Sequence, residues 1–75
     1  MDINFNIVSE IGVLPSKGGW NLELNLVSWN GAKPKYDLRK WNDSHTKMGK
    51  GVTMDEEELF ALRDLINAYC DELEP

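Results

Sequence analysis

The stretch WNLELNLVSWNGAKPKYDLRKW, residues 20–41, decides the fold. In its first half leucines alternate with polar residues, and this period of two is typical of a β-strand with one buried and one solvated face. The pair Asn30-Gly31 interrupts the alternation and is a strong signal for a tight turn. The alternation resumes over residues 35–41. The stretch therefore predicts two strands joined by a short turn.

The alternation also predicts which way the side chains point. We expect the core-facing set to be Trp20, Leu22, Leu24, Leu26, Tyr36 and Leu38. We expect the solvent-facing set to be Asn21, Glu23, Asn25, Asp37 and Arg39, together with Trp29 and Trp41. A bulge would reverse the parity beyond it. Alternatively, each of these two tryptophans wraps around a sheet edge and packs on the core, where large aromatic side chains mostly lie.

Further elements flank this stretch. Residues 3–14 alternate roughly and contain β-branched side chains, which predicts a first strand, and residues 15–19 are typical of a turn. After a polar loop at 42–49, the segment KGVTM at residues 50–54 predicts a short fourth strand. Four strands are therefore expected before the C-terminal segment.

The C-terminal segment is typical of an amphipathic helix. Asp55 and Glu58 have the spacing of a capping box, and acidic residues at a helix start are favoured by the helix dipole. An apolar stripe with spacings of three and four follows, and it consists of Leu59, Leu62, Ile66, Tyr69 and Leu73, widened by Phe60, Leu65 and Cys70. This stripe is broader than one small sheet needs, which favours packing against a second subunit. We expect one α+β domain over residues 1–75, in the order β-β-β-β-α.

The size of the chain limits its stability. A domain of 75 residues buries only about 60% of its unfolded surface, so its core is marginal. The single cysteine, Cys70, excludes an internal disulfide and suits a reducing compartment. No apolar run approaches the roughly 20 residues of a membrane span, and the first residues lack the basic region of a signal peptide. We expect a cytoplasmic protein that does not enter a membrane and that gains stability by oligomerisation.

The charge is segregated along the chain. The formal net charge is −5, but residues 1–54 hold seven Lys or Arg against five Asp or Glu, whereas residues 55–75 hold eight acids and only Arg63 as a base. Association with a polyanion depends on the local field rather than on the total charge. An acidic composition therefore does not exclude nucleic acid as a partner.

The residues that commonly carry catalysis offer little support for an enzyme. His45 and Cys70 are each the only residue of their kind, so neither a metal cluster nor a Cys/His dyad is indicated, and His45 is expected to be a solvated loop residue. The sequence GKG at 49–51 is too short for a phosphate-binding loop. We expect no catalytic activity, no cofactor, no metal and no small-molecule substrate.

Aromatic and basic residues instead suggest a binding surface. Aromatic faces beside Lys and Arg form a platform on which unstacked bases lie while the cations meet phosphates, and duplex DNA would hide those base faces. The candidate residues are Trp29, Trp41, Lys17, Lys33, Lys35, Arg39, Lys40, Lys47 and Lys50. The alternatives are that these cations only confer solubility, or that the acidic helix or a strand edge recruits a protein partner.

Two strings in the chain, YDLRKW at 36–41 and GKGVTMDEEELFAL at 49–62, occur in an order that resembles a known family. This family is the single-strand-binding domain of the transcriptional coactivator called positive cofactor four, particularly its small bacterial members. Residues 29 to about 66 match in order, and the similarity to the bacterial members covers nearly the whole chain. The resemblance implies a curved four-stranded antiparallel sheet, one helix, a homodimer formed through the helices, and single-stranded DNA bound across the sheets.

The resemblance also implies roles for individual residues. Trp29 corresponds to the stacking aromatic before the turn, Arg39 to an arginine that meets phosphate, and Trp41 to the aromatics that close the third strand. The residues themselves do not distinguish DNA from RNA. They also do not distinguish a role in transcription from one in replication or repair.

Five lysines are placed by the same resemblance. Lys33 or Lys35 corresponds to a lysine after the turn, and an inserted proline leaves that register open. Lys47 and Lys50 correspond to basic residues before the last strand, and Lys40 adds a charge where the family can have an acid. For the helix, the expected dimer contacts are Leu59, Leu62, Ile66 and Tyr69.

Overall fold

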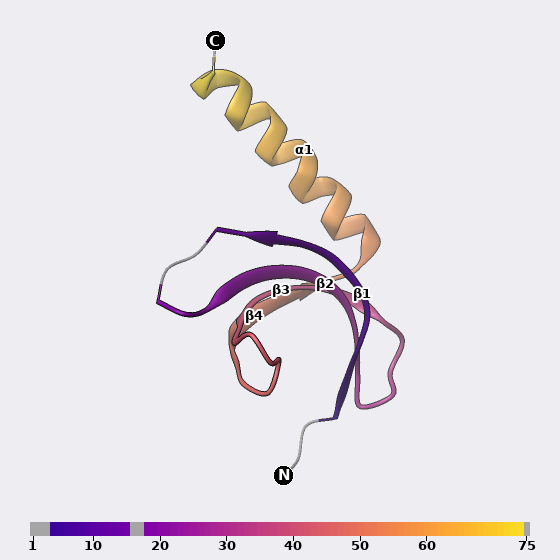
Figure 1. Cartoon of the computed structure of the whole chain (residues 1–75). Helices are drawn as coiled ribbons and strands as arrows, with labels where there is room; N and C mark the ends of the chain where they lie inside the picture. Colours follow the sequence, from indigo (N-terminus) through magenta and orange to yellow (C-terminus); the bar gives the residue numbers. More distant parts are fainter. Residues whose placement is uncertain (1–3, 16–17, 75) are drawn as a thin grey trace.

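The computed structural model describes residues 4–15 and 18–74. Over these residues the chain forms a four-stranded antiparallel sheet in the order β1-β2-β3-β4, followed by one helix (Figure 1). The elements are β1 (Phe5–Leu14), β2 (Asn21–Trp29), β3 (Lys35–Trp41), β4 (Met48–Met54) and α1 (Glu56–Leu73). The expected order β-β-β-β-α is confirmed, and β3 has the predicted bounds.

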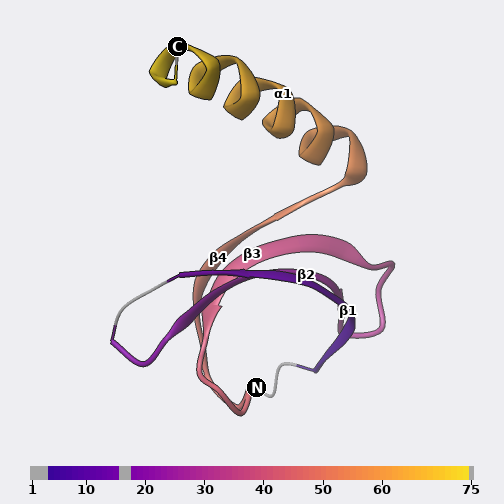
Figure 2. The ribbon, with the colours of Figure 1, turned by 45° about the horizontal axis from the view of Figure 1, so that its top comes forward.

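The first strand and the turns give the sheet its shape. β1 pairs with β2 through two register shifts, one between Ile7 and Ser9 and one between Glu10 and Gly12. Such bulges bend a strand and increase its twist. Figure 2 shows the resulting sheet curled around one side, which we call the concave face, while the helix lies beyond the opposite, convex face. The sheet is therefore an open, curved layer rather than a flat one.

The alternation predicted the two sets of side chains correctly but assigned the wrong set to the core. An apolar hollow between the sheet and the helix is lined by Leu24, Leu38 and Met54 of the strands, so this set faces the convex side. The opposite set lies on the concave face, and its buried members are Glu23, Asn25, Val27, Asp37 and Trp41. The leucines, by contrast, are only half-buried.

Curvature explains this inversion. A curled sheet brings the side chains of its concave face together, so the face that carries polar residues becomes the enclosed one. Burial of polar groups is tolerated when they find partners, and here Asp37 pairs with Arg39 while Glu23 pairs with His45. The leucine face, which a single short helix covers only in part, keeps much of its apolar surface open.

The helix begins as the sequence predicts. The backbone N–H of Glu58 donates to the side chain of Asp55 over 2.8 Å, and the backbone N–H of Asp55 donates to the side chain of Glu58 over 3.0 Å. This reciprocal pair is the expected capping box. No helix in the described ranges is long and apolar enough to cross a membrane.

Most of the helix stands away from the sheet (Figure 1). None of its residues is buried, and only Leu59, Leu62 and Cys70 are half-buried. Ile66 and Tyr69 are 50% and 62% exposed. The apolar stripe predicted from the sequence is thus present, but this single chain leaves it largely uncovered.

Candidate nucleic-acid interface

Three aromatic rings from three strands meet on the concave face. Phe5 of β1 is paired with Trp29 of β2 in the sheet, and their ring centroids lie 6.0 Å apart. The Phe5 ring also lies 5.0 Å from that of Trp41 on β3. Both tryptophans are therefore on the predicted face. Sequence reasoning overlooked Phe5, although the alternation at the start of β1 places it at a position that can share this face.

The two tryptophans differ in exposure. Trp29 is half-buried, whereas Trp41 has no exposed surface. The expectation that Trp41 presents an open ring is therefore wrong, because Phe5 packs against it and the ring of His45 lies 5.4 Å away. Trp41 forms the buried floor of the aromatic cluster, and Trp29 retains accessible surface.

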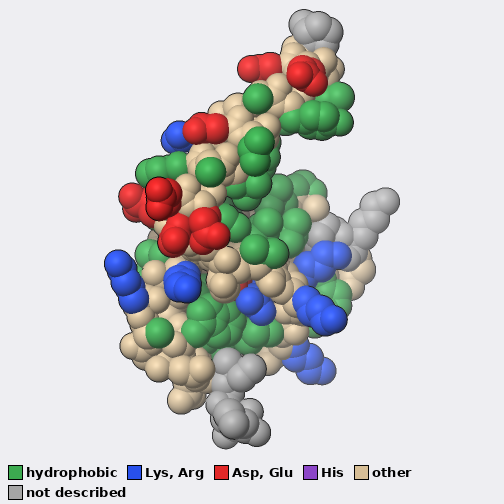
Figure 3. All heavy atoms as spheres, turned by 180° about the vertical axis from the view of Figure 1, so that it is seen from behind, with side chains coloured by type: hydrophobic (Ala, Val, Ile, Leu, Met, Phe, Trp, Pro, Cys, Tyr) green, Lys and Arg blue, Asp and Glu red, His purple; other side chains and the backbone are tan. Residues whose placement is uncertain are grey.

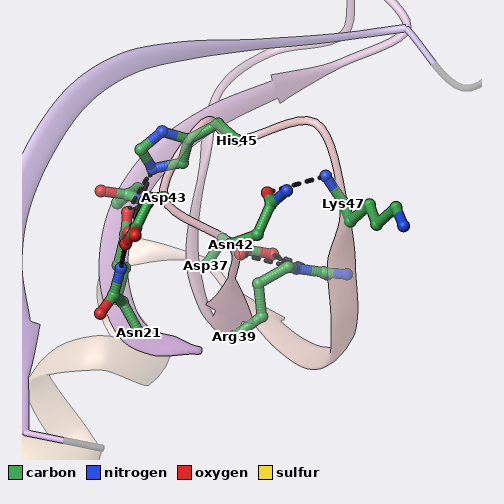
Figure 4. A network of polar contacts seen from close by, with 9 residues as sticks. Asn21, Asp37, Arg39, Asn42, Asp43, His45 and Lys47 are labelled. Carbon is green, nitrogen blue, oxygen red and sulfur yellow. Dashed lines mark hydrogen bonds and ion pairs between the residues drawn. The ribbon is translucent and has the colours of Figure 1, made fainter. Parts of the chain in front are cut away.

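Arg39 is held tightly beside this cluster. Its Nε donates to both carboxylate oxygens of Asp37 over 2.8 and 2.9 Å, and its Nη2 donates to the same carboxylate over 2.8 Å. Its Nη1 donates to the carbonyl of Gly49 over 3.2 Å and lies 3.6 Å from the sulfur of Met48. The Asp37 side chain is fully buried and that of Arg39 is 14% exposed. The predicted phosphate ligand is thus already in an ion pair (Figure 4).

The guanidinium of Arg39 also covers part of Trp29. Its Cζ lies 4.7 Å from the centroid of the indole ring, which is a cation–π contact. Within the described residues, the buried Nε1 atoms of Trp29 and Trp41 have no hydrogen-bond partner. Trp29 is therefore held through its ring faces and edges rather than through its N–H group.

A second polar pair, His45 with Glu23, lies beside the first on the concave face, because Glu23 is paired directly with Arg39 in the register of β2 with β3. His45 Nε2 lies 2.8 and 3.0 Å from the two carboxylate oxygens of Glu23, and Asn25 donates to the same carboxylate over 3.1 Å. Because a carboxylate only accepts, this imidazole nitrogen carries a proton and donates. The expectation of a solvated loop histidine is wrong, since His45 is half-buried and contacts Trp41.

The loop between β3 and β4 holds His45 in place. The side chain of Asn42 accepts from the backbone N–H of Lys47 over 2.9 Å and donates to the hydroxyl of Thr46 over 2.8 Å. His45 itself has a φ of 57°, a left-handed conformation that is uncommon for residues with a side chain. The loop therefore directs an imidazole back onto the concave face.

The candidate lysines are exposed and lie on the sheet and its loops. The described ones are Lys33, Lys35, Lys40, Lys47 and Lys50, and none of them forms a salt bridge to another described residue. Lys17 lies outside the described residues. Figure 3 shows the Lys and Arg side chains mainly over the sheet and the Asp and Glu side chains mainly along the helix, so the segregation of charge predicted from the sequence is also spatial.

The lysines fall into two groups. Lys33 and Lys35 follow the β2–β3 turn and line a hollow together with Asp55 and Glu56 at the start of the helix. Lys40, Lys47 and Lys50 belong to the opposite end of the β3–β4 hairpin and its loop. A polyanion that crosses the sheet would meet cations at both ends.

Comparison with known proteins identifies the family of this chain. Residues 16–65, well over half of the chain, match the family model described as Transcriptional Coactivator p15 (PC4). The chain belongs to the PC4 family. It is also 47% identical over 68 residues to an uncharacterized protein of Treponema pallidum (strain Nichols), an alignment that covers 89% of this chain and 80% of that relative. The resemblance inferred from the strings at residues 36–41 and 49–62 is thereby confirmed.

Proposed function

We propose that this PC4-family chain binds single-stranded DNA with little sequence preference, by stacking bases on Trp29 and contacting phosphates with exposed lysines. The observation that supports this most directly is a half-buried indole, which keeps some accessible surface, on the same sheet as five exposed lysines without described ion-pair partners. Stacking on an aromatic ring tolerates any base, because every base has a π face. Membership in the PC4 family supports the same activity.

Trp41 has a different part in this proposal. Because its ring is fully buried, it supports Phe5 and the concave face from beneath and does not itself offer a surface to a base. Trp29 is then the aromatic that a base reaches first. Neither role requires a catalytic group or a cofactor.

The exposed lysines supply the electrostatic part of binding. Lys33 and Lys35 lie at one end of β3, and Lys47 and Lys50 lie toward the other, so the phosphates of a nucleic-acid strand that passes Trp29 can meet cations on both sides. Lys40 is paired with Leu22 on the convex side of the sheet, so in this proposal it adds to the positive field rather than lining the path beside Trp29. Lys17 is included in the proposed site on the strength of its position in the first loop of the sequence. Unstacked bases and a flexible backbone favour a single strand over a duplex on such a surface.

We also propose that two copies associate through the convex face and the helix. Within one chain, the groove between the convex face of the sheet and the helix is lined mainly by apolar side chains. Among them are Leu14, Leu24, Leu38, Leu59, Leu62 and Ile66. An apolar surface of this kind is rarely left in water. Burying the face that includes Tyr69 would supply the core that a chain of 75 residues lacks. The lone Cys70 fits a reducing compartment such as the cytoplasm.

A salt titration tests the binding proposal. Each phosphate neutralised on a single strand contributes about −0.7 to the slope of log K against log salt. Four to six contacts per protomer would therefore give a slope of about −3 to −4 for oligo-dT, and the binding should quench tryptophan fluorescence. A slope near zero, or binding no tighter than to a matched duplex, would refute the proposal.

Matched DNA and RNA oligomers separate the remaining candidates. Equal affinity for both would extend the proposal to single-stranded RNA, because stacking and phosphate contacts alone do not sense the 2′-hydroxyl group. If the chain bound RNA more strongly than DNA, single-stranded RNA would replace single-stranded DNA as the proposed ligand. Failure to bind either, with a folded chain, would favour the protein-interaction role that the sequence left open.

A further inference from the structure

We propose that Arg39 is a positioning residue that fixes the Trp29 indole for stacking, and that it does not neutralise a phosphate. This inference rests on the proposed function, and it departs from the role that the family resemblance implies for this arginine.

The guanidinium has little left to offer a phosphate. Of its five N–H groups, the one on Nε and one on Nη2 donate to the Asp37 carboxylate, and the two on Nη1 meet the carbonyl of Gly49 and the sulfur of Met48, which leaves one N–H of Nη2 without a partner among the described residues. A guanidinium recognises phosphate well when two parallel N–H groups are free to form a fork. In this chain the fork formed by Nε and Nη2 already binds the carboxylate of Asp37, and the side chain of Arg39 is only 14% exposed.

The charge of Arg39 is balanced as well. The Asp37 carboxylate is fully buried and lies 2.8 Å from Nη2, so the two opposite charges form a compact, neutral pair. A phosphate that approached Arg39 would also approach Asp37, and repulsion by the carboxylate would offset attraction to the guanidinium. The exposed lysines have no such partner among the described residues. They therefore attract the phosphates of a nucleic-acid strand more strongly than the neutral pair of Arg39 and Asp37 does.

The ion pair of Arg39 with Asp37 also fixes the ring of Trp29. The guanidinium lies 4.7 Å from its centroid, and the Phe5 ring meets it at 6.0 Å with an interplanar angle of 48°. Asp37 holds the guanidinium plane, and the guanidinium in turn holds the indole. A ring that is already oriented loses less freedom when a base stacks on it, which is the advantage of a preorganised site.

Two variants of the full chain separate positioning from phosphate binding. Arg39→Lys keeps a cation but loses the planar fork that binds Asp37 while the guanidinium lies over the indole. The double variant Asp37→Asn/Arg39→Gln removes both charges together, so that no buried carboxylate is left alone. We expect both variants, checked for folding by circular dichroism, to bind oligo-dT about five-fold or more weaker, as when a stacked base is lost. The salt slope should stay that of the wild type.

A variant in which an exposed lysine is replaced is the matched control for the salt slope of oligo-dT binding. Lys47→Gln should make the slope less steep by about 0.7, because this residue is proposed to meet a phosphate. If the double variant at Asp37 and Arg39 shows the same loss of slope, or if Arg39→Lys binds as tightly as the wild type, Arg39 is a phosphate ligand and the inference is overturned.

A measurement without nucleic acid keeps this inference separate from the proposed function. The indole N–H resonance of Trp29, assigned by its loss in Trp29→Phe, should shift or broaden in Arg39→Lys, whereas it should be unchanged in Lys47→Gln. If the wild type binds no single strand, the proposed function fails, and this resonance still decides whether Arg39 positions the ring. An unchanged Trp29 resonance in Arg39→Lys would overturn the positioning role.

Discussion

Gly51 lies directly opposite Arg39 in the pairing of β3 with β4. A Cβ atom at position 51 would lie 2.7 Å from the carbonyl oxygen of Leu38 and 2.9 Å from Nε of Arg39, and it would overlap the Cβ of Arg39. Two of these atoms belong to the neighbouring strand near its backbone, so they cannot swing aside. Glycine at this position therefore lets the Arg39 side chain lie against β4, where its Nη1 reaches the carbonyl of Gly49, while Nε and Nη2 bind Asp37 on its own strand.

We expect Gly51→Ala to lower the free energy of unfolding by about 1–3 kcal/mol, the usual range for an overpacked site. The two strands must separate locally, and the pairing of Arg39 with Asp37 is disturbed. Urea denaturation followed by circular dichroism measures this change.

Gly49→Ala is the control on the same strand. Its nearest contact for an added Cβ is Lys40 at 3.7 Å, an ordinary van der Waals distance. We expect a change no greater than about 1 kcal/mol, the normal difference between glycine and alanine in a strand. Equal destabilisation by both substitutions would show that close approach to Arg39 is not the reason for glycine at position 51.

The pair of His45 and Glu23 should behave as a coupled unit. His45→Gly removes the imidazole but suits the left-handed backbone at this position, so the loss reports on the side chain. We expect it to cost about 1–3 kcal/mol, because a buried carboxylate loses a hydrogen bond. The same change in a Glu23→Gln background should cost clearly less. Additive effects in this double-mutant cycle would contradict the coupling.

The sequence was sufficient for the order of elements because the signals for these elements are local. Leucines at every second position identify β2, and the spacing of Asp55 and Glu58 identifies the helix start. The two-residue separation of Asp37 and Arg39 also places opposite charges on one face of β3, so this ion pair was within reach of sequence reasoning.

The burial of the faces was not predictable in the same way. Parity says which residues share a face, but the curvature that encloses one face depends on how β1 bulges against β2. The contact of His45 with Glu23 joins residues that are 22 positions apart, and nothing local signals it. For this reason Trp41 was expected to be open and was instead found buried.

The two tryptophans of the aromatic cluster should separate binding from folding. We expect Trp29→Ala to remain folded and to bind oligo-dT about 5- to 150-fold more weakly, the equivalent of one lost stacking contact. Trp41→Ala should cost about 3–5 kcal/mol and leave a chain of this size largely unfolded, because the whole ring is buried. Fluorescence titration and thermal unfolding measure the two effects. Unchanged affinity in folded Trp29→Ala would remove this residue from the site.

Ile66 tests the proposed association of two copies. This residue is 50% exposed in the single chain and lines the apolar groove between helix and sheet. A lysine there would place a charge in an interface that excludes water, so Ile66→Lys should give a monomer or an unfolded chain, whereas Asn67→Lys, at an exposed polar position of the same helix, should leave the association unchanged. Sedimentation measures the mass of each variant. A stable wild-type monomer at high micromolar concentration would contradict the dimer and leave the apolar helix face to another partner.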